Sequence, residues 1–198
     1  MEKPKLLIVA GPNGSGKTSV TSKILKHEWI KGCQYINPDI IARDVFGDWN
    51  SQNAVMQAVH HAANLREECI ANERSLIFET VLSAPDKISF IQRAKQKGYF
   101  IRLFFIGTDH PQINAARIVH RVMMGGHDVP ISKIISRYSK SIINCKLLVP
   151  VVDRLYLYDN SVDDVFPQLL FRASDGKLTK QYAPIREWEK NIFLEANM

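Results

Sequence analysis

The sequence has few of the features that mark membrane-spanning or disulfide-bonded proteins. No apolar run approaches the ~18 uncharged residues of a membrane helix, which excludes an integral membrane protein. The run at residues 6–10 is too short for the core of a signal peptide, and a glycine-rich loop follows it. The three cysteines, Cys33, Cys69 and Cys145, lie far apart without paired Cys or His. We therefore expect no disulfide framework, no structural zinc site and a reducing, cytoplasmic location.

The composition is that of one globular domain with a substantial core. Of the 198 residues, 45% are hydrophobic and 23% are charged, and the chain contains no repeats or low-complexity segments. The net charge of +6 favours anionic partners. Charge alone does not distinguish between nucleotides, nucleic acids and membrane surfaces.

Short apolar runs alternate with longer segments of helical periodicity, which indicates an α/β fold. The expected strands are 6–10, 34–36, 75–78, 100–106 and 154–158. The expected helices are 16–28, 51–73, 86–97, 111–124 and 131–147. Because the strands are almost continuously apolar, we expect a parallel sheet of about five strands with helices on both faces.

The pattern changes after the last of these strands. Two short segments, 168–172 and 178–182, flank Asp175-Gly176, which is a hairpin signal, and a final amphipathic helix follows them. We therefore expect a single domain that spans the whole chain, with a small C-terminal appendage at about 165–198.

A phosphate-binding loop (P-loop) follows the first strand. The pattern GxxxxGK[ST] is matched at every fixed position, between an apolar run and a helical segment. The residues expected to bind nucleotide are Gly11, Pro12, Asn13, Gly14, Ser15, Gly16, Lys17, Thr18 and Ser19. Glycines let backbone N–H groups face an anion, and the helix N-terminus adds a partial positive charge. Lys17 can reach the β- and γ-phosphates of ATP as a catalytic residue, and the Thr18 hydroxyl can bind Mg²⁺.

The rest of the sequence disfavours several classes of P-loop protein. It has no NKxD guanine signature, no LSGGQ signature of transporter ATPases, and little length for a helicase or motor core. The remaining polar motifs lie at the ends of predicted strands. In open α/β sheets this is where substrates bind.

One of these motifs places a carboxylate after the second strand. Asp39 lies in the segment Asn37-Pro38-Asp39, where the chain leaves the carboxyl edge of the sheet. Asp39 can accept a proton from a substrate hydroxyl that attacks the γ-phosphate of ATP. It can equally cap the helix that follows. The residues themselves leave both interpretations open.

The third strand delivers a second acidic group to the same edge. Glu79 ends an otherwise apolar run and is followed by Thr80, with Ser83 three residues further on. Glu79 can hold Mg²⁺ through water or bind substrate hydroxyls, and Thr80 adds a polar group beside it. We interpret Glu79 and Thr80 as substrate-binding residues.

A basic helix and a glycine pair suggest a lid at about 109–130. Arg117 and Arg121 are four residues apart and therefore share a helix face. Arginines on a glycine-hinged segment suit a lid that neutralises charge in phosphoryl transfer, which makes both candidates for catalysis. The alternative is a solvated basic face. His127 in the turn is either a surface residue or a ligand.

Taken together, these motifs resemble the zeta toxin family of P-loop kinases, especially its compact ATPase-like branch. The matching segments are GPNGSGKTS, NPD with the following IIA, FETVLS, and RIVHRVMMGGHDVP continuing into ISRY. They occur in the family's order over roughly residues 6–160. The resemblance implies an ATP-dependent kinase with a nucleoside-monophosphate-kinase-like fold. In the best-known members the acceptor is a UDP-linked amino sugar.

The resemblance also implies roles for individual residues. Lys17 and Thr18 match the phosphate and Mg²⁺ ligands, and Asp39 matches the catalytic base. Glu79 matches the substrate-binding acid, and Arg117 or Arg121 matches the lid arginine. If the chain is a toxin of this kind, a protein antitoxin is an expected partner.

The chain departs from the family pattern at two positions. The best-known toxins carry another substrate-binding acid on the helix before the third strand, where this chain has Ala63, with Arg66 and Glu67 nearby. They also place a second lid arginine where this chain has His127. Both departures affect the acceptor pocket or the second lid contact and leave the triphosphate residues intact.

Two alternatives from other functional classes remain. One is an ATP-binding switch whose slow hydrolysis signals to a protein partner. The other is a polynucleotide 5′-kinase, which the basic charge admits. The sequence has no stripe of aromatic and basic residues of the kind that stacks single strands, so a nucleic-acid partner is not expected.

Overall fold

The computed structural model describes residues 3–47, 51–125 and 129–193. The strands are β1 (Lys5–Ala10), β2 (Gln34–Ile36), β3 (Leu76–Thr80), β4 (Phe100–Gly107), β5 (Arg154–Asp159), β6 (Gln168–Ser174) and β7 (Lys177–Gln181). The helices are α1 (Lys17–Ile24), the 3-10 turn η1 (Glu28–Ile30), α2 (Pro38–Asp44), α3 (Gln52–Ala71), α4 (Pro85–Gln96), α5 (Pro111–Met123), α6 (Ile131–Leu148) and α7 (Glu187–Phe193). No helix in these ranges is long and apolar enough to cross a membrane.

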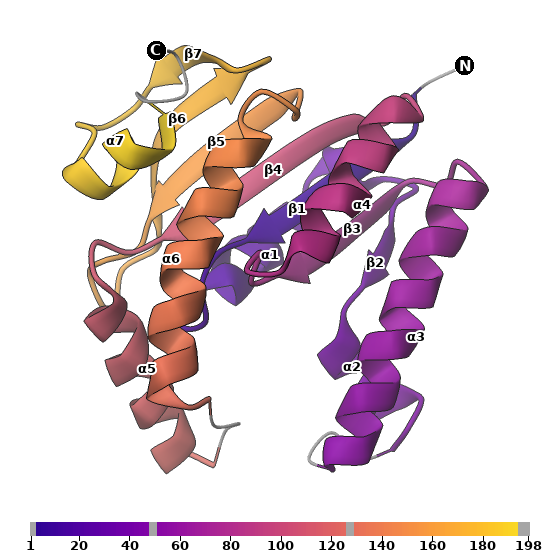
Figure 1. The fold of residues 1–198 in the computed structure, drawn as a ribbon, viewed down its shortest axis with the longest axis horizontal. Helices are drawn as coiled ribbons and strands as arrows, with labels where there is room; N and C mark the ends of the chain where they lie inside the picture. Colours follow the sequence, from indigo (N-terminus) through magenta and orange to yellow (C-terminus); the bar gives the residue numbers. More distant parts are fainter. Residues whose placement is uncertain (1–2, 48–50, 126–128, 194–198) are drawn as a thin grey trace.

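The strands form one sheet in the order β2-β3-β1-β4-β5-β6-β7 (Figure 1). Strands β1 to β5 pair in parallel, as the alternation of apolar runs and helices predicted. The connection from β1 to β2 passes over β3, and the connection from β3 to β4 passes over β1. The carboxyl ends of β1, β2 and β3 therefore lie at one edge, where the candidate site residues follow.

The sheet has seven strands rather than about five, because the C-terminal hairpin joins it. Strand β6 pairs antiparallel with β5 and then with β7. Leu170, Phe171 and Ala173 of β6 are buried. A free β5 edge would expose a row of unpaired backbone groups, and β6 covers that edge. The hairpin is therefore an extension of the sheet and not a separate appendage.

Helices cover both faces of the sheet (Figure 1). One face packs against α3, α4, α6 and α7 around a large core that includes Phe78 and Phe105. The other face packs against α1, with Val20 and Ile24, and against Trp29 of η1. Burial on both faces explains why the parallel strands read as nearly continuous apolar runs.

Helix α5 and the N-terminal part of α6 pack against each other beyond the edge of the sheet (Figure 1). Their contact is a small apolar cluster of Ile118, Val129 and Ile134. His127 and Gly126, which the sequence placed in a lid hinge, lie outside the described residues.

Candidate active site

The P-loop follows β1. Two of its glycines, Gly11 and Gly16, leave no space for a side chain. Gly11 has φ of 151°, and a Cβ there would lie 2.1 Å from the carbonyl oxygen of Ile106. Gly16 has φ of 86° and caps α1, and a Cβ there would lie 2.2 Å from Asn160 Nδ2. Both contacts are far closer than real Cβ atoms show. The sequence therefore uses glycine where only glycine fits.

Two asparagine side chains donate hydrogen bonds to the backbone of the P-loop. Asn114 Nδ2 of α5 donates to the carbonyl of Asn13 at 2.6 Å, and Asn160 Nδ2, after β5, donates to the carbonyl of Ser15 at 2.9 Å. In a trans peptide the carbonyl and the following N–H point in opposite directions. Each bond therefore turns the N–H of the following glycine away from the asparagine, toward the side where an anion would bind. Sequence motifs gave no sign of either asparagine.

Arg117 is tied to the same structure. Its guanidinium donates to the carbonyl of Asn160 at 2.8 Å and to that of Gly14 at 3.5 Å, and it pairs with Asp163 at 2.7 Å. Its side chain is only 21% exposed, so the solvated basic face considered for this helix does not describe Arg117. Arg117 holds the P-loop and the segment after β5 together.

Lys17 is the first residue of α1, and its ammonium lies inside the loop. Its Nζ donates to the carbonyl oxygens of Gly11 and Pro12, each at 2.9 Å. These carbonyls hold the ammonium where a bound phosphate would replace them as partners. These two hydrogen bonds fix the position of the ammonium within the loop.

Burial lowers the pKa of Lys17 to about 8. The nearby carboxylate of Glu79 opposes this decrease in pKa, the guanidinium of Arg121 adds to it, and the carboxylate of Asp39 opposes it. These influences show that four of the predicted site residues share one electrostatic environment. The structure thus brings Lys17, Glu79, Arg121 and Asp39 together from four elements.

The hydroxyl residues of the loop differ in accessibility. Ser15 is fully buried, and its Oγ has no hydrogen-bond partner, so an anion in the loop would meet its backbone only. Thr18 and Ser19 are exposed on the first turn of α1. The glycine backbone of the P-loop and the exposed Thr18 hydroxyl directly after Lys17 fit a nucleotide with Mg²⁺. The Thr18 hydroxyl would bind the Mg²⁺. Among the described residues no three His, Cys, Asp or Glu side chains form a metal site by themselves.

Asn37, and not Asp39, caps α2. The Oδ1 of Asn37 accepts a hydrogen bond from the backbone N–H of Asp39 at 2.9 Å. The Asp39 carboxylate stands in the first turn of α2 and is exposed. The sequence left two roles open for Asp39, and Asn37 takes one of them, the capping of α2.

Glu79 ends a chain of hydrogen bonds at the carboxyl edge. Asn37 Nδ2 donates to the hydroxyl of Tyr35 at 2.9 Å, and that hydroxyl donates to Glu79 Oε1 at 2.8 Å. Burial raises the pKa of Tyr35; the hydrogen bond from Asn37 opposes the increase, and the carboxylate of Glu79 adds to it. The tyrosine therefore stays protonated and fixes the orientation of Glu79. Its position within an apolar strand hid this role from sequence reasoning.

Thr80 is occupied by the backbone of its own loop. Its Oγ1 accepts from the N–H of Leu82 at 3.0 Å, and its carbonyl accepts from the N–H of Gly11 at 3.2 Å. Leu82 has a φ of 58°, so the hydroxyl supports an unusual turn. Thr80 links β3 to the P-loop; binding of substrate by its side chain remains a prediction.

A cavity of about 270 Å³ opens beside the P-loop. Its lining residues are Gly14, Gly16, Ser19, Arg117, Asn160, Val162, Asp163, Asp164 and Val165. It lies against α1 and the segment after β5, on the opposite side of the loop from β3. Its lining combines two valines with the polar residues Ser19 and Asn160, the acidic residues Asp163 and Asp164, and Arg117, which pairs with Asp163.

A buried cation lies one helical turn after Ala63, the position that departs from the family pattern. Arg66 of α3 is only 7% exposed, and its guanidinium lies 5.2 Å from the centre of the Phe78 ring. Burial lowers its pKa, and the carboxylates of Asp86 and Glu67 raise it. Ala63, one turn earlier, is partly buried. The charged group nearest to Ala63 on this face of α3 is therefore packed against the β3 side chain Phe78.

Comparison with known proteins assigns the family. The family model described as Zeta toxin matches residues 1–148. The chain belongs to the zeta toxin family. An uncharacterised protein of Haemophilus influenzae is 31% identical over 134 residues, which cover 68% of this chain and 92% of that protein. The match confirms the resemblance drawn from the P-loop, NPD and FETVLS segments.

Solved structures agree on the fold. The AvrRxo1-ORF1:-ORF2 complex with ATP matches with a TM-score of 0.66 at 18% identity, over 89% of this chain and 60% of that one. The PezAT toxin–antitoxin system of Streptococcus pneumoniae matches with a TM-score of 0.64 at 16% identity, over 98% of this chain and 80% of that one. This zeta toxin family member thus has the fold of P-loop kinases, and it spans about 60% of the length of the AvrRxo1 chain.

Proposed function

We propose that this protein is an ATP-dependent small-molecule kinase, which transfers the γ-phosphate of ATP to a hydroxyl of its acceptor. One observation carries the proposal: Lys17 in a complete P-loop shares its surroundings with two carboxylates, Asp39 and Glu79, at the carboxyl edge of the sheet. One carboxylate here can orient and deprotonate an acceptor hydroxyl while the other binds further hydroxyls of the acceptor. The complex of a similar fold with ATP supports the choice of nucleotide.

Each residue has a definite part in this reaction. The backbone N–H groups of the P-loop and the Lys17 ammonium bind the β- and γ-phosphates. Mg²⁺, when bound by Thr18 and the phosphates, would neutralise phosphate charge. Asp39 is exposed and free of the capping role, so it can orient the acceptor hydroxyl and accept its proton. Glu79, fixed by Tyr35, can bind further acceptor hydroxyls.

Arg121 completes the phosphate environment from α5. Its charge contributes to the lowered pKa of Lys17, and we infer that it meets phosphate charge at this site. Arg117, one turn earlier, keeps the P-loop in its binding conformation. We therefore assign direct phosphate contact to Arg121 and positioning to Arg117, within a lid that spans about residues 109–130.

The family favours a UDP-linked amino sugar as acceptor and a protein antitoxin as partner. The similarity to the PezAT toxin–antitoxin fold supports the second of these. Both would place the protein in the cytoplasm, where ATP and sugar nucleotides occur.

Turnover measured with and without acceptor tests the proposal. We expect slow ATP hydrolysis alone, and rapid ADP formation with equimolar phosphorylated product when a hydroxyl acceptor such as UDP-N-acetylglucosamine is present. Lys17→Ala should abolish both. Hydrolysis of the same slow rate with every small-molecule or oligonucleotide acceptor would instead identify an ATP-dependent switch, and phosphorylation of oligonucleotide 5′ ends alone would identify a polynucleotide kinase.

A further inference from the structure

One face of the sheet is left open at its outer strands. On the side of α1 and η1, the apolar cluster includes a single residue of β6, Leu169, and within the described ranges it includes none of β7. All five residues of β7 are exposed. The outer strands therefore present their side chains on this side to solvent, whereas α7 packs against the sheet on the other side.

Basic side chains from four strands meet on this open face. Arg102 of β4 is paired with Arg154 of β5, and Arg172 of β6 is paired with Lys180 of β7. Directly paired residues of neighbouring strands share one face of a sheet. Arg172 is also paired with Tyr156, which belongs to the apolar cluster on the α1 side. We call these four cations the basic face of β4–β7.

Aromatic rings lie among the cations. The guanidinium of Arg102 lies 4.9 Å from the centre of the Trp29 ring and 4.6 Å from the centre of the Phe100 ring. At the other end of the face, Nζ of Lys180 lies 4.9 Å from the centre of the Tyr182 ring. The side chain of Tyr182 is 45% exposed, so its ring is open to a ligand.

Further tyrosines join the two ends of this face. Burial raises the pKa of Tyr158, and the nearby phenols of Tyr156 and Tyr182 add to the increase, so the three rings are neighbours. The strands that carry these rings and the four cations are far apart in the sequence. For this reason the sequence itself shows no stripe of aromatic and basic residues, and the sheet assembles one.

Three of the four cations have no acidic partner within the described part of the chain. Arg154 lies 3.6 Å from the exposed carboxylate of Asp175. By contrast, Arg172 donates to the neutral Thr179 hydroxyl at 3.4 Å, and the buried Nε of Arg102 has no hydrogen-bond partner. The face therefore keeps its positive charge and attracts a polyanion.

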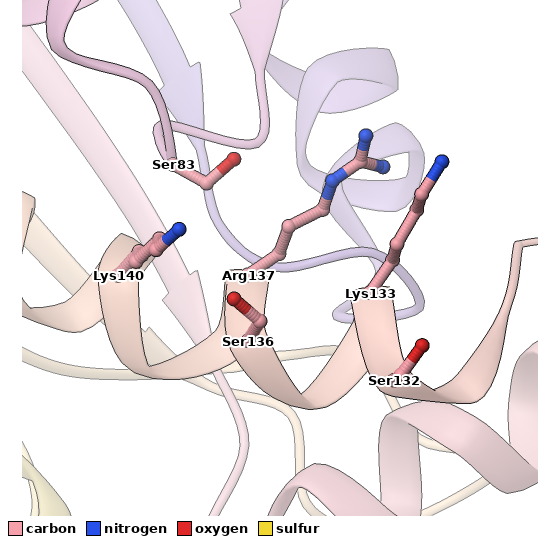
Figure 2. A pocket seen from close by; sticks show the side chains of 6 residues that line it. All are labelled: Ser83, Ser132, Lys133, Ser136, Arg137 and Lys140. Carbon is pink, nitrogen blue, oxygen red and sulfur yellow. The ribbon is translucent and has the colours of Figure 1, made fainter.

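The basic face lies away from the P-loop and from both cavities beside it. One of these is the cavity at Arg117. The other, of about 310 Å³, is lined by Ser83 and by five residues of α6, among them Arg137 and Lys140 (Figure 2). Helix α6 packs on the opposite side of the sheet. The basic face begins near the amino ends of β4 and β5, whereas the P-loop follows the carboxyl end of β1. Binding on this face is therefore separate from the kinase site.

We propose that the basic face of β4–β7 binds single-stranded nucleic acid. The four cations meet its phosphates, and its bases stack on the exposed Tyr182 ring and on guanidinium planes. The rings favour nucleic acid over other polyanions, because every base offers a flat face on which an aromatic side chain can stack. A single strand is favoured over a duplex, in which the base faces are already stacked on one another.

Fluorescence anisotropy on the full chain tests the proposal. The probe is a labelled single-stranded oligonucleotide with a blocked 5′ end, so that it cannot accept a phosphoryl group. The P-loop is first saturated with Mg²⁺ and a non-hydrolysable ATP analogue, so that phosphates cannot bind there. We expect the single strand to bind more tightly than the duplex of the same sequence or inorganic polyphosphate. The logarithm of its affinity should fall linearly with the logarithm of salt concentration.

Matched variants locate the binding and separate charge from stacking. Lys180→Gln should weaken the single strand and make the slope of the salt dependence shallower by about 0.7, the effect of one lost phosphate contact. Tyr182→Ala should weaken it by about tenfold at an unchanged slope, and Tyr182→Phe, which keeps the ring, should bind as the wild type does. Lys140→Gln removes the same charge from the α6 cavity and should change nothing. Equal melting temperatures show that the variants are folded.

Three results would overturn the proposal. The first is that no single strand binds at low salt, and the second is that Lys180→Gln and Lys140→Gln weaken it equally. The third is that polyphosphate or vesicles containing phosphatidylserine bind as tightly as the single strand and that Tyr182→Ala changes nothing. That result would identify a surface for polyanions in general or for membranes. Failure of the kinase assay would leave the proposal intact, because the basic face shares no residue with the P-loop site.

Discussion

The residues of the site are held in place by hydrogen bonds that short sequence motifs do not predict. The P-loop pattern predicted which residues would bind phosphate, because the spacing of glycines and lysine is local. The partners that orient the loop, Asn114 and Asn160, lie about a hundred or more residues away and come from other elements. Nothing in their neighbouring sequence marks them. Likewise Asn37 could have been recognised as a cap only by weighing it against Asp39 two residues later.

The pKa of Lys17 makes nucleotide affinity dependent on pH. Without nucleotide the pKa is about 8, so the ammonium loses its proton as pH rises through that value. Bound phosphates stabilise the charged form and raise the pKa. We expect ATP affinity to be highest below pH 8 and to fall between pH 8 and 9.5, with proton uptake on binding at pH 8.5.

Calorimetry in two buffers of different ionisation enthalpy measures this proton uptake. The Lys17→Met variant should bind more weakly and show no lysine-linked uptake. An equal number of protons in the wild type at pH 7 and pH 8.5, with constant affinity, would show that the lysine keeps an ordinary pKa.

The role of Arg117 can be separated from direct phosphate contact. Arg117→Met leaves the carbonyls of Gly14 and Asn160 without their donor, so the P-loop should lose order. We expect ATP-analogue affinity to fall by roughly tenfold, the effect of one lost charged hydrogen bond, together with a lower melting temperature without ligand. Arg93→Met, which removes an exposed arginine paired with Glu67, is the control. Reduced affinity with an unchanged melting temperature would argue for direct contact with nucleotide instead.

At the scale of elements, the expected strands and the long helices were predicted within about two residues, whereas the end of α1 and the short helix α2 were not. Helix α6 was expected at 131–147 and observed at Ile131–Leu148. Helix α1 was expected at 16–28 but ends at Ile24, and a 3-10 turn follows because Trp29 packs against Phe104 and Tyr156. The packing of the Trp29 ring against the sheet therefore ends the helix earlier than its sequence pattern predicts.

Helix α7 is anchored over the sheet by Trp188 and Glu189. The Trp188 ring fills the space above Gly107, where a Cβ would lie 2.2 Å from it. Glu189 is fully buried, and its Oε2 accepts from the backbone N–H of Arg186 at 2.5 Å. Burial raises the pKa of Glu189 to about 7; the hydrogen bond from Arg186 opposes the increase, and the nearby carboxylate of Asp159 adds to it.

The raised pKa predicts a stability that depends on pH at α7. The folded state binds the Glu189 proton more tightly than the unfolded state, so this group favours folding at low pH and loses that contribution as pH rises from 4.5 through 7. Asp159 and Asp109 disfavour the ionised carboxylate, and Arg186 favours it. Glu189→Gln should therefore raise the melting temperature at pH 8.5 and leave it nearly unchanged at pH 5.5.

The same helix provides the control for this measurement. Glu187 is exposed and pairs with Lys190, so Glu187→Gln should show no such dependence on pH. If Glu189→Gln destabilises the protein equally at both pH values, the carboxylate is ionised and satisfied in the folded state.

At the scale of the whole molecule, the parallel topology was predictable and the full width of the sheet was not. Continuous apolar runs separated by helices indicate a parallel sheet, whichever order the strands take. The hairpin signal at Asp175-Gly176 predicted two strands correctly, but pairing of β6 with β5 is a long-range choice. Strand β6 pairs with β5 because β5 would otherwise have an open edge and because one side of β6 is apolar.

The molecule as a whole places two cavities and two carboxylates around one P-loop. One cavity lies beside Arg117, and the other lies beside Arg137, whose guanidinium donates to Asn13 Oδ1 of the loop at 3.4 Å. Asp39 is exposed in the first turn of α2, and we propose it as the residue on which kinase chemistry depends. The capping function that could have explained its presence belongs to Asn37.

The most direct test is the single-turnover rate of phosphoryl transfer to the acceptor by Asp39→Asn. Asparagine has the size of aspartate but cannot accept the proton, so the rate should fall by about 10²–10⁴-fold, while ATP affinity and melting temperature stay unchanged. Asp44→Asn, on the same helix and paired with Arg43, should keep the wild-type rate. Transfer by Asp39→Asn within a few-fold of the wild type would contradict the account and move the search for the base to Glu79.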